Sequence, residues 1–168
     1  QGSYFHEEDG DTIHNSVWLA RRTGEFLENQ DPDKPFCLTV NFKSPHYPLE
    51  PDERDKHLFD DVEIPWRKTD TPEEYAKMAS HIMDSSLNKW CYYDERGNDS
   101  IRWKYEREFL GCVMSLDRGI GQILDKLEEM NLDENTCVIF LSDHGLLWGE
   151  HGIAGKWLLY QEIIRTPM

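Results

Sequence analysis

The chain has 168 residues, of which 38% are hydrophobic and 30% are charged, and its formal net charge is −15 at pH 7. The length suits one ordinary domain with a buried core, and the hydrophobic content excludes a fully disordered chain. The acidic excess argues against a nucleic-acid-binding surface, which needs clustered Lys and Arg, but it still allows a small anionic substrate in a local pocket. No apolar run approaches the length of a membrane span.

The first part of the chain predicts a helix followed by a buried strand. Apolar residues recur at near-helical spacing over residues 11–29, which predicts a helix there. After a proline-containing break, residues 36–42 form a mostly apolar run that is typical of a strand buried on both faces. The prolines of residues 44–48 end this strand and place His46 between them.

The later part predicts two more helices and a second strand. Residues 50–70 are polar and contain prolines, which indicates a long excursion over the surface. Thr71, followed by proline and two glutamates, predicts a capped helix start. Residues 102–130 repeat apolar side chains at helical spacing, and residues 136–141 form another apolar run. This order of elements predicts an α/β domain with a mostly parallel sheet flanked by helices.

Polar side chains follow both predicted strands. His46 comes after the first strand, and Asp143 and His144 come after the second. Sites in open α/β sheets form beyond the carboxyl ends of the strands, which meet at one edge of a parallel sheet. We therefore expect these three residues to emerge at the same edge.

The loop over residues 141–156 is the densest chemical cluster in the sequence. It contains Asp143, His144, Glu150, His151 and Lys156 among four glycines, and loops carry function more often than cores do. The adjacent Asp143 and His144 cannot form a through-space relay with a serine, and no Gly-x-Ser-x-Gly elbow is present. Metal ligation by one carboxylate and one imidazole is the functional interpretation, and a turn-capping Asp143 is the structural one.

The other charged residues of this loop have weaker local signals. Lys156 could hold an anionic group as a point charge, although most lysines are simply solvated. His151 could ligate a metal or support the ligands from outside, and Glu150 is interpreted as structural. His46, by itself, is compatible with either a hydrogen-bonded structural role or a catalytic one.

Several blocks together resemble the sulfatases of the alkaline-phosphatase superfamily. They are Asp143-His144-Gly145, Gly149-Glu150-His151-Gly152, Lys156 and Ile164-Arg165-Thr166-Pro167, preceded by Asp33-Lys34-Pro35-Phe36, Ser44-Pro45-His46-Tyr47-Pro48, Leu116-Asp117-Arg118-Gly119-Ile120-Gly121 and Asp133-Glu134-Asn135-Thr136. The resemblance spans residues 34–168, and the order and spacing of the blocks make it specific.

The resemblance implies a metal-dependent hydrolase of sulfuric esters with an alkaline-phosphatase-like fold. By this analogy Asp143 and His144 complete the metal site, Lys156 contacts the sulfate, and His46 contacts the sulfate or protonates the leaving oxygen. Glu150 and His151 take supporting roles. Calcium is the metal that the family implies, and the imidazole of His144 keeps manganese or zinc open.

The sequence departs from the family pattern at the nucleophile. The family uses a formylglycine made from the cysteine of a Cys-x-Pro-Ser-Arg-type motif, and none of the cysteines here has that context (Cys37, Cys91, Cys112, Cys137). The upstream acidic metal ligands are missing as well. We therefore expect residues 1–168 to be a single partial catalytic domain that is inactive alone, with the formylglycine in an upstream segment.

Two other functions stay open. One is a phosphodiesterase or phosphonate monoester hydrolase of the same superfamily, and the other is a non-catalytic binding domain. The resemblance implies a sulfate ester, commonly on a carbohydrate, as substrate, and a periplasmic, secreted or lysosomal location. The oligomeric state does not follow from the sequence.

Overall fold

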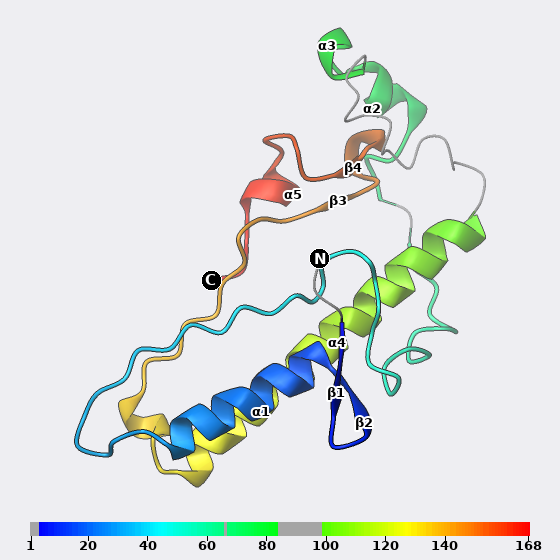
Figure 1. The fold of residues 1–168 in the computed structure, drawn as a ribbon. Coiled ribbons are helices and arrows are strands. Elements are labelled where there is room, and N and C mark those ends of the chain that lie inside the picture. The colour runs from blue at the N-terminus through cyan, green and yellow to red at the C-terminus, as the bar shows by residue number, and fades with distance from the viewer. Residues whose placement is uncertain (1–3, 66, 84–98) are drawn as a thin grey trace. The chain divides into compact units, whose positions relative to one another are not determined.

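The computed structural model describes residues 4–65, 67–83 and 99–168 (Figure 1). The chain divides into two compact units, one comprising residues 1–62 and 107–137 and the other comprising residues 63–106 and 138–168. We call them unit 1 and unit 2, and each is described by itself. Within the described ranges, no helix has the length and apolar character needed to cross a membrane.

Unit 1 begins with a β-hairpin where the sequence predicts the start of a helix. Strands β1 (Phe5–Glu8) and β2 (Asp11–His14) pair antiparallel. The turn between them is Asp9-Gly10, with positive φ angles of 53° and 87°, and Asp-Gly is a strong hairpin signal. Helix α1 (Asn15–Glu28) starts only after this hairpin. The prediction of a helix from residue 11 was therefore wrong over its first turn.

The long predicted helix is confirmed as α4 (Asp99–Glu129). From residue 107 onward it belongs to unit 1, where it runs beside α1 (Figure 1). The two helices approach closely at Gly119, because a Cβ atom there would lie 2.7 Å from the backbone oxygen of Ser16. The short 3₁₀ helix η3 (Asp133–Asn135) follows α4.

Part of the predicted surface excursion packs onto α4 through a buried polar network. The hydroxyl group of Ser115 accepts a hydrogen bond from the backbone N–H of Asp52 and donates one to the carboxylate of Asp55, both at 2.9 Å. Asp55 is 1% exposed and forms an ion pair with Arg118. Because a buried carboxylate needs such partners, these contacts hold residues 52–55 against the helix.

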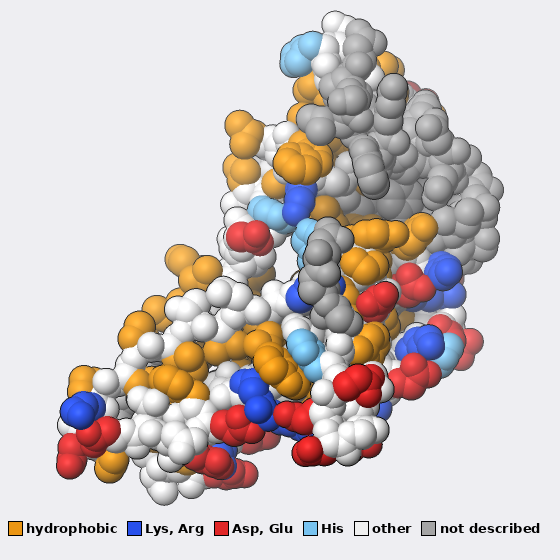
Figure 2. Space-filling model, viewed as in Figure 1, with side chains coloured by type: hydrophobic (Ala, Val, Ile, Leu, Met, Phe, Trp, Pro, Cys, Tyr) orange, Lys and Arg blue, Asp and Glu red, His pale blue; other side chains and the backbone are white. Residues whose placement is uncertain are grey.

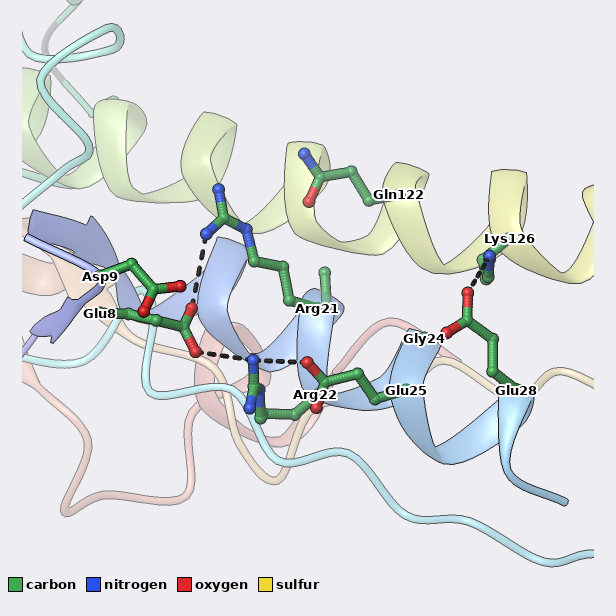
Figure 3. Close-up of a pocket in the computed structure, with 10 residues that line it drawn as sticks. Glu8, Asp9, Arg21, Arg22, Gly24, Glu25, Glu28, Gln122 and Lys126 are labelled. Atoms are coloured by element: carbon green, nitrogen blue, oxygen red, sulfur yellow. Dashed lines mark hydrogen bonds and ion pairs between the residues drawn. The ribbon is translucent and has the colours of Figure 1, made fainter. Parts of the chain in front are cut away.

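Paired charges line a shallow pocket in unit 1, between the hairpin, α1 and α4 (Figure 3). Arg22 lies between Glu8 and Glu25, at 2.7 and 2.6 Å, and Lys126 reaches Glu28 at 2.5 Å. On the face shown in Figure 2, acidic and basic side chains are likewise interspersed. The cations of this pocket are thus engaged by carboxylates, which argues against it as an anion site.

Unit 2 is built from short elements around a small apolar core. They are α2 (Pro72–Ala76), α3 (Ser80–Met83), β3 (Leu147–Trp148), the 3₁₀ helix η4 (Glu150–Gly152), β4 (Ala154–Gly155) and α5 (Gln161–Ile164). The predicted cap is confirmed, since the Thr71 hydroxyl accepts from the backbone N–H of Glu74 at 3.2 Å. The core residues come from the connection after α2, from β3, from the residue before β4 and from α5 (Met78, Leu147, Ile153, Ile163).

The described residues do not contain the predicted parallel sheet. Their sheets are two antiparallel pairs, β1–β2 and β3–β4. Residues 36–42 and 136–141 form no strand, and the second run is exposed, with Ile139 71% and Leu141 60% accessible. An apolar run becomes a strand only when a neighbouring strand supplies its hydrogen bonds, and neither run has one among the described residues.

Candidate functional site

The loop over residues 141–156 is held in unit 2 by contacts that require glycine. The backbone N–H of Gly145 donates to the oxygen of Ile163 at 2.7 Å, and a Cβ atom at Gly145 would clash with the backbone oxygen of Glu162. Gly149 has a φ of 106°, and a Cβ there would lie 2.9 Å from the carboxylate of Asp70. Glycine has no Cβ and adopts positive φ without strain, so these positions let the loop pack closely.

His144 and Lys156 meet directly within this loop. The ammonium Nζ of Lys156 lies 3.0 Å from Nε2 of His144, and Nδ1 of the same ring lies 2.9 Å from the carbonyl oxygen of Gly145. An ammonium group can only donate, so Nε2 must accept and Nδ1 must carry the proton. In this arrangement the Nε2 lone pair is directed at a positive charge. This is the tautomer that a metal-ligating histidine with a carbonyl-bound Nδ1 adopts.

Asp143 places a carboxylate beside that lone pair. Its Oδ2 lies 3.6 Å from Nε2 of His144, its Oδ1 accepts from the backbone N–H of His144 at 3.0 Å, and its side chain is 85% exposed. Two ligands that each lie about 2.0–2.6 Å from an ion can be this far apart. No group of three His, Cys, Asp or Glu residues placed to hold a metal occurs in the searched ranges 4–65, 67–83 and 99–168.

Glu150 braces the turn between β3 and β4. Its Oε2 accepts from the backbone N–H of Trp148 at 2.6 Å, and its Oε1 accepts from Nε of Arg67 at 3.0 Å. Arg67 also lies 3.5 Å from the carboxylate of Glu106, a residue that is 3% exposed. Both oxygens of Glu150 are therefore engaged inside unit 2. The sequence had no local signal for the Arg67 contact, because 83 positions separate the partners.

His151 lies in the same turn with a φ of 59°. Its backbone N–H donates to the hydroxyl of Thr69 at 3.1 Å, and its ring stacks on Tyr160 with centroids 4.3 Å apart. Nε2 of His151 lies 3.5 Å from the carboxylate of Glu162. These contacts connect the turn to the segment before α2 and to α5. They are compatible with the supporting role that was predicted for His151.

His46 belongs to unit 1 and stands on a segment without regular secondary structure. Its ring is exposed, and Nδ1 lies 2.6 Å from the carbonyl oxygen of Tyr47. With Nδ1 donating to that oxygen, Nε2 is the nitrogen left for proton transfer. Because Asp143 and His144 belong to unit 2, their expected meeting with His46 at one sheet edge stays a prediction.

Comparison with known proteins identifies the family. The family model named Sulfatase matches residues 11–168, which is nearly the whole chain. This chain belongs to the sulfatase family. The resemblance inferred from the sequence blocks is therefore confirmed.

Curated relatives of this sulfatase-family chain are longer proteins. It is 28% identical to an N-acetylglucosamine-6-O-sulfatase of Bacteroides thetaiotaomicron, with 100% of the chain and 41% of the relative covered. It is 26% identical to an arylsulfatase of Clostridium perfringens, with 94% and 32% covered. The chain thus spans less than half the length of these relatives.

A solved structure shares the fold of this chain over part of its own length. This structure, a complex of a protein with its substrate D-glucosamine-2-N,6-O-disulfate, aligns at a TM-score of 0.72 and 24% identity, covering 97% of this chain and 44% of that one. The likeness shows that the chain has part of the fold of the sulfatases, which is alkaline-phosphatase-like. It adds no parallel sheet to the described residues.

Proposed function

We propose that this chain carries part of the active site of a metal-dependent sulfatase that cleaves a sulfate ester on a sulfated sugar. The observation that carries the proposal is the contact between Lys156 and His144 with Asp143 alongside. It gathers a fixed positive charge, an oriented imidazole lone pair and an exposed carboxylate into one loop. A sulfuryl group develops negative charge on its oxygens during transfer, and such a cluster is suited to stabilise it.

Asp143 and His144 would hold a divalent metal. Their donor set, one carboxylate oxygen and one imidazole nitrogen, fits calcium with its preference for oxygen as well as manganese or zinc with their tolerance of imidazole. When bound, the cation supplies Lewis-acid stabilisation of the sulfate oxygens. A calcium shell takes about six to eight ligands, so the others would come from the upstream part of the protein.

Lys156 and His46 act on the substrate directly in this proposal. Lys156 binds a non-bridging oxygen of the sulfate as a point charge. When the bond between sulfur and the ester oxygen breaks, the electron pair goes to that oxygen. A proton from Nε2 of His46 then neutralises it, because a protonated imidazole near neutral pKa is an effective general acid.

The sulfated-sugar substrate is supported by the relatives. One curated relative is named for a 6-O-sulfated N-acetylglucosamine, and one solved relative is bound to a disulfated glucosamine. The nucleophile would be a formylglycine upstream of these residues, as the family pattern implies. For that reason we expect the 168-residue polypeptide by itself to show no sulfatase turnover.

A phosphoester substrate is the second candidate. The chain is 24% identical to the multifunctional alkaline phosphatase superfamily protein PehA of Trinickia caryophylli, with 92% of the chain and 32% of that protein covered. A substrate panel separates the two candidates. Preference for a phosphodiester or phosphonate monoester over the matched sulfate ester would favour the second.

The test uses the complete protein that carries these 168 residues. After treatment with a chelator, calcium, manganese and zinc are titrated back while binding heat and the hydrolysis of glucosamine 6-sulfate are recorded. We expect Asp143→Ala to weaken metal binding and to abolish the metal-dependent activity. Asp61→Ala, which removes an exposed carboxylate from unit 1, should leave both unchanged. Equal metal affinity in the two variants would support the non-catalytic reading of the fold instead.

A further inference from the structure

We propose that Tyr4 and His14 are positioning residues for His46, which they hold by binding backbone carbonyl groups on both sides of it. The inference rests on the proposed function in one respect, namely that His46 protonates the leaving oxygen. All of the contacts lie within unit 1. They join the first hairpin and the start of α1 to residues 43–50.

The side chain of Tyr4 contacts two backbone carbonyl groups of residues 43–46. Its ring is completely buried, and its hydroxyl group donates to the carbonyl oxygen of His46 and lies 3.3 Å from that of Lys43. The ammonium of Lys43 sits 4.0 Å from the centroid of the Tyr4 ring, which adds a cation–π contact. The backbone oxygen of Tyr4 accepts from the N–H of Asn15 at 2.6 Å, so the residue is fixed to the start of α1.

The side chain of His14 contacts the same segment at residue 50. Its Nδ1 accepts from the backbone N–H of Ser16 at 3.2 Å and thereby caps α1. Nε2 then carries the proton, and it donates to the carbonyl oxygen of Glu50 at 3.1 Å. The His14 ring is 2% exposed and lies 5.7 Å from the ring of Tyr4, centroid to centroid. The two side chains thus form one buried anchor beneath residues 43–50.

The anchor matters because His46 has no helix or strand to hold it. Its backbone N–H donates to the carbonyl oxygen of Lys43 at 2.8 Å, and that same oxygen lies within reach of the Tyr4 hydroxyl. Its own carbonyl oxygen accepts from Tyr4. Turning the His46 backbone would break these bonds together. These bonds therefore fix the backbone from which the exposed ring projects, and the 2.6 Å contact of Nδ1 with the carbonyl oxygen of Tyr47 orients the ring itself, as general-acid catalysis requires.

Both anchoring groups are kept in the donor state that they need. Burial raises the pKa of the Tyr4 phenol, so it keeps its proton. Burial also lowers the pKa of His14, so its ring stays neutral with one nitrogen accepting and the other donating.

The test compares leaving groups in the complete protein. A sugar or other alkyl sulfate needs a proton on its leaving oxygen, whereas 4-nitrophenyl sulfate releases a stable phenolate and needs little help. His46→Ala is the benchmark and should lower kcat on the alkyl sulfate by about 10²–10⁴-fold. Tyr4→Phe removes only the hydroxyl group and should lower that kcat by about 10–100-fold, while KM and the turnover of the aryl sulfate change little. Tyr105→Phe, which removes a hydroxyl from a partly exposed tyrosine in unit 2, serves as the matched control.

A second measurement does not depend on activity. Hydrogen exchange at the His46 amide should accelerate in Tyr4→Phe, while exchange at Gly145, in the other unit, stays the same. Local acceleration together with selective loss on the alkyl sulfate supports the proposal. Equal losses on both sulfates, unchanged kinetics in Tyr4→Phe, or acceleration at both amides would overturn it. If the unaltered protein cleaves no sulfate ester, the proposed function fails. Unchanged hydrogen exchange at the His46 amide in Tyr4→Phe would contradict the anchoring role of Tyr4 whether or not the protein is a sulfatase.

Discussion

The ammonium group of Lys156 lies 3.0 Å from Nε2 of His144, whose other ring nitrogen is tied to the carbonyl oxygen of Gly145. The residue that would bind the sulfate and the residue that would ligate the metal are thus in direct contact. A metal held by His144 would take the Nε2 lone pair that the Lys156 ammonium contacts here, so the ammonium would turn from His144 to the sulfate when the metal binds. The first prediction follows from it.

Replacing Lys156 with alanine should lower turnover of a sulfate ester in the complete protein by about 2–4 kcal/mol of activation free energy. The loss is expected in kcat, since a point charge aimed at the developing sulfate charge acts most strongly in the transition state. Steady-state kinetics with a sulfated sugar measure it. Lys34→Ala removes an equal charge from an exposed side chain of unit 1, 75% accessible, and should be neutral. Unchanged kinetics in Lys156→Ala would remove this residue from the site.

Replacing Arg67 with methionine should destabilise unit 2, because it removes one ion-pair partner from Glu150 and one from the buried Glu106. The side chain of Arg67 is 27% exposed, so we expect about 1–3 kcal/mol rather than the full cost of a completely buried pair. Denaturant unfolding gives the free energy. The control Arg21→Met breaks a pair with Glu8 in which Arg21 is 53% exposed, and it should cost under about 1 kcal/mol. Equal costs would contradict the bracing role of Arg67.

Two glycines of α4 should respond oppositely to alanine. At Gly119 the new Cβ would lie 2.7 Å from the backbone oxygen of Ser16, which cannot move without separating the helices, so we expect a loss of about 1–3 kcal/mol. At Gly121 nothing lies within 4 Å, and alanine should stabilise the helix by about 0.5–1 kcal/mol. Thermal unfolding of both variants tests this. Stabilisation by both substitutions would contradict the close approach of α1 and α4 at Gly119.

The buried His14 should make stability depend on pH. Burial lowers its pKa below the ordinary value of 6.5 in the folded chain, so the unfolded chain binds the proton first as pH falls. The free energy of unfolding should therefore decrease as pH drops from about 6.5 through the lower folded-state pKa. His14→Asn keeps a capping side chain but cannot titrate, and its stability should vary less over this range. Parallel pH profiles for the two proteins would assign the dependence to other groups.

Local patterns predicted the elements whose stability is local. Helix α4 and the Thr71 cap follow from periodicity and capping chemistry, which act within a few residues. The Asp9-Gly10 turn was not predicted, because the apolar spacing from residue 11 was interpreted as the start of a helix. Residues 11–14 form a strand rather than a helix, because the two-residue turn with positive φ reverses the chain and pairs them with the preceding strand.

Contacts between distant residues could not be predicted in this way. Tyr4 reaches the carbonyl oxygen of His46 across 42 positions, and Arg67 reaches Glu150 across 83. Neither contact produces a periodic pattern in the sequence, because each depends on how separate segments pack. The apolar run over residues 136–141 presents the opposite case, since its composition predicts burial but does not specify a partner strand.

The sequence by itself determined the family, through the order and spacing of its blocks, and the chemical types gathered between residues 141 and 156. Only the tertiary structure decided which atoms meet. It directed Lys156 at Nε2 of His144, turned Glu150 toward Arg67, and placed Tyr4 beneath His46. Side-chain identity sets what a group can donate or accept, whereas distance and direction arise only when the backbone packs.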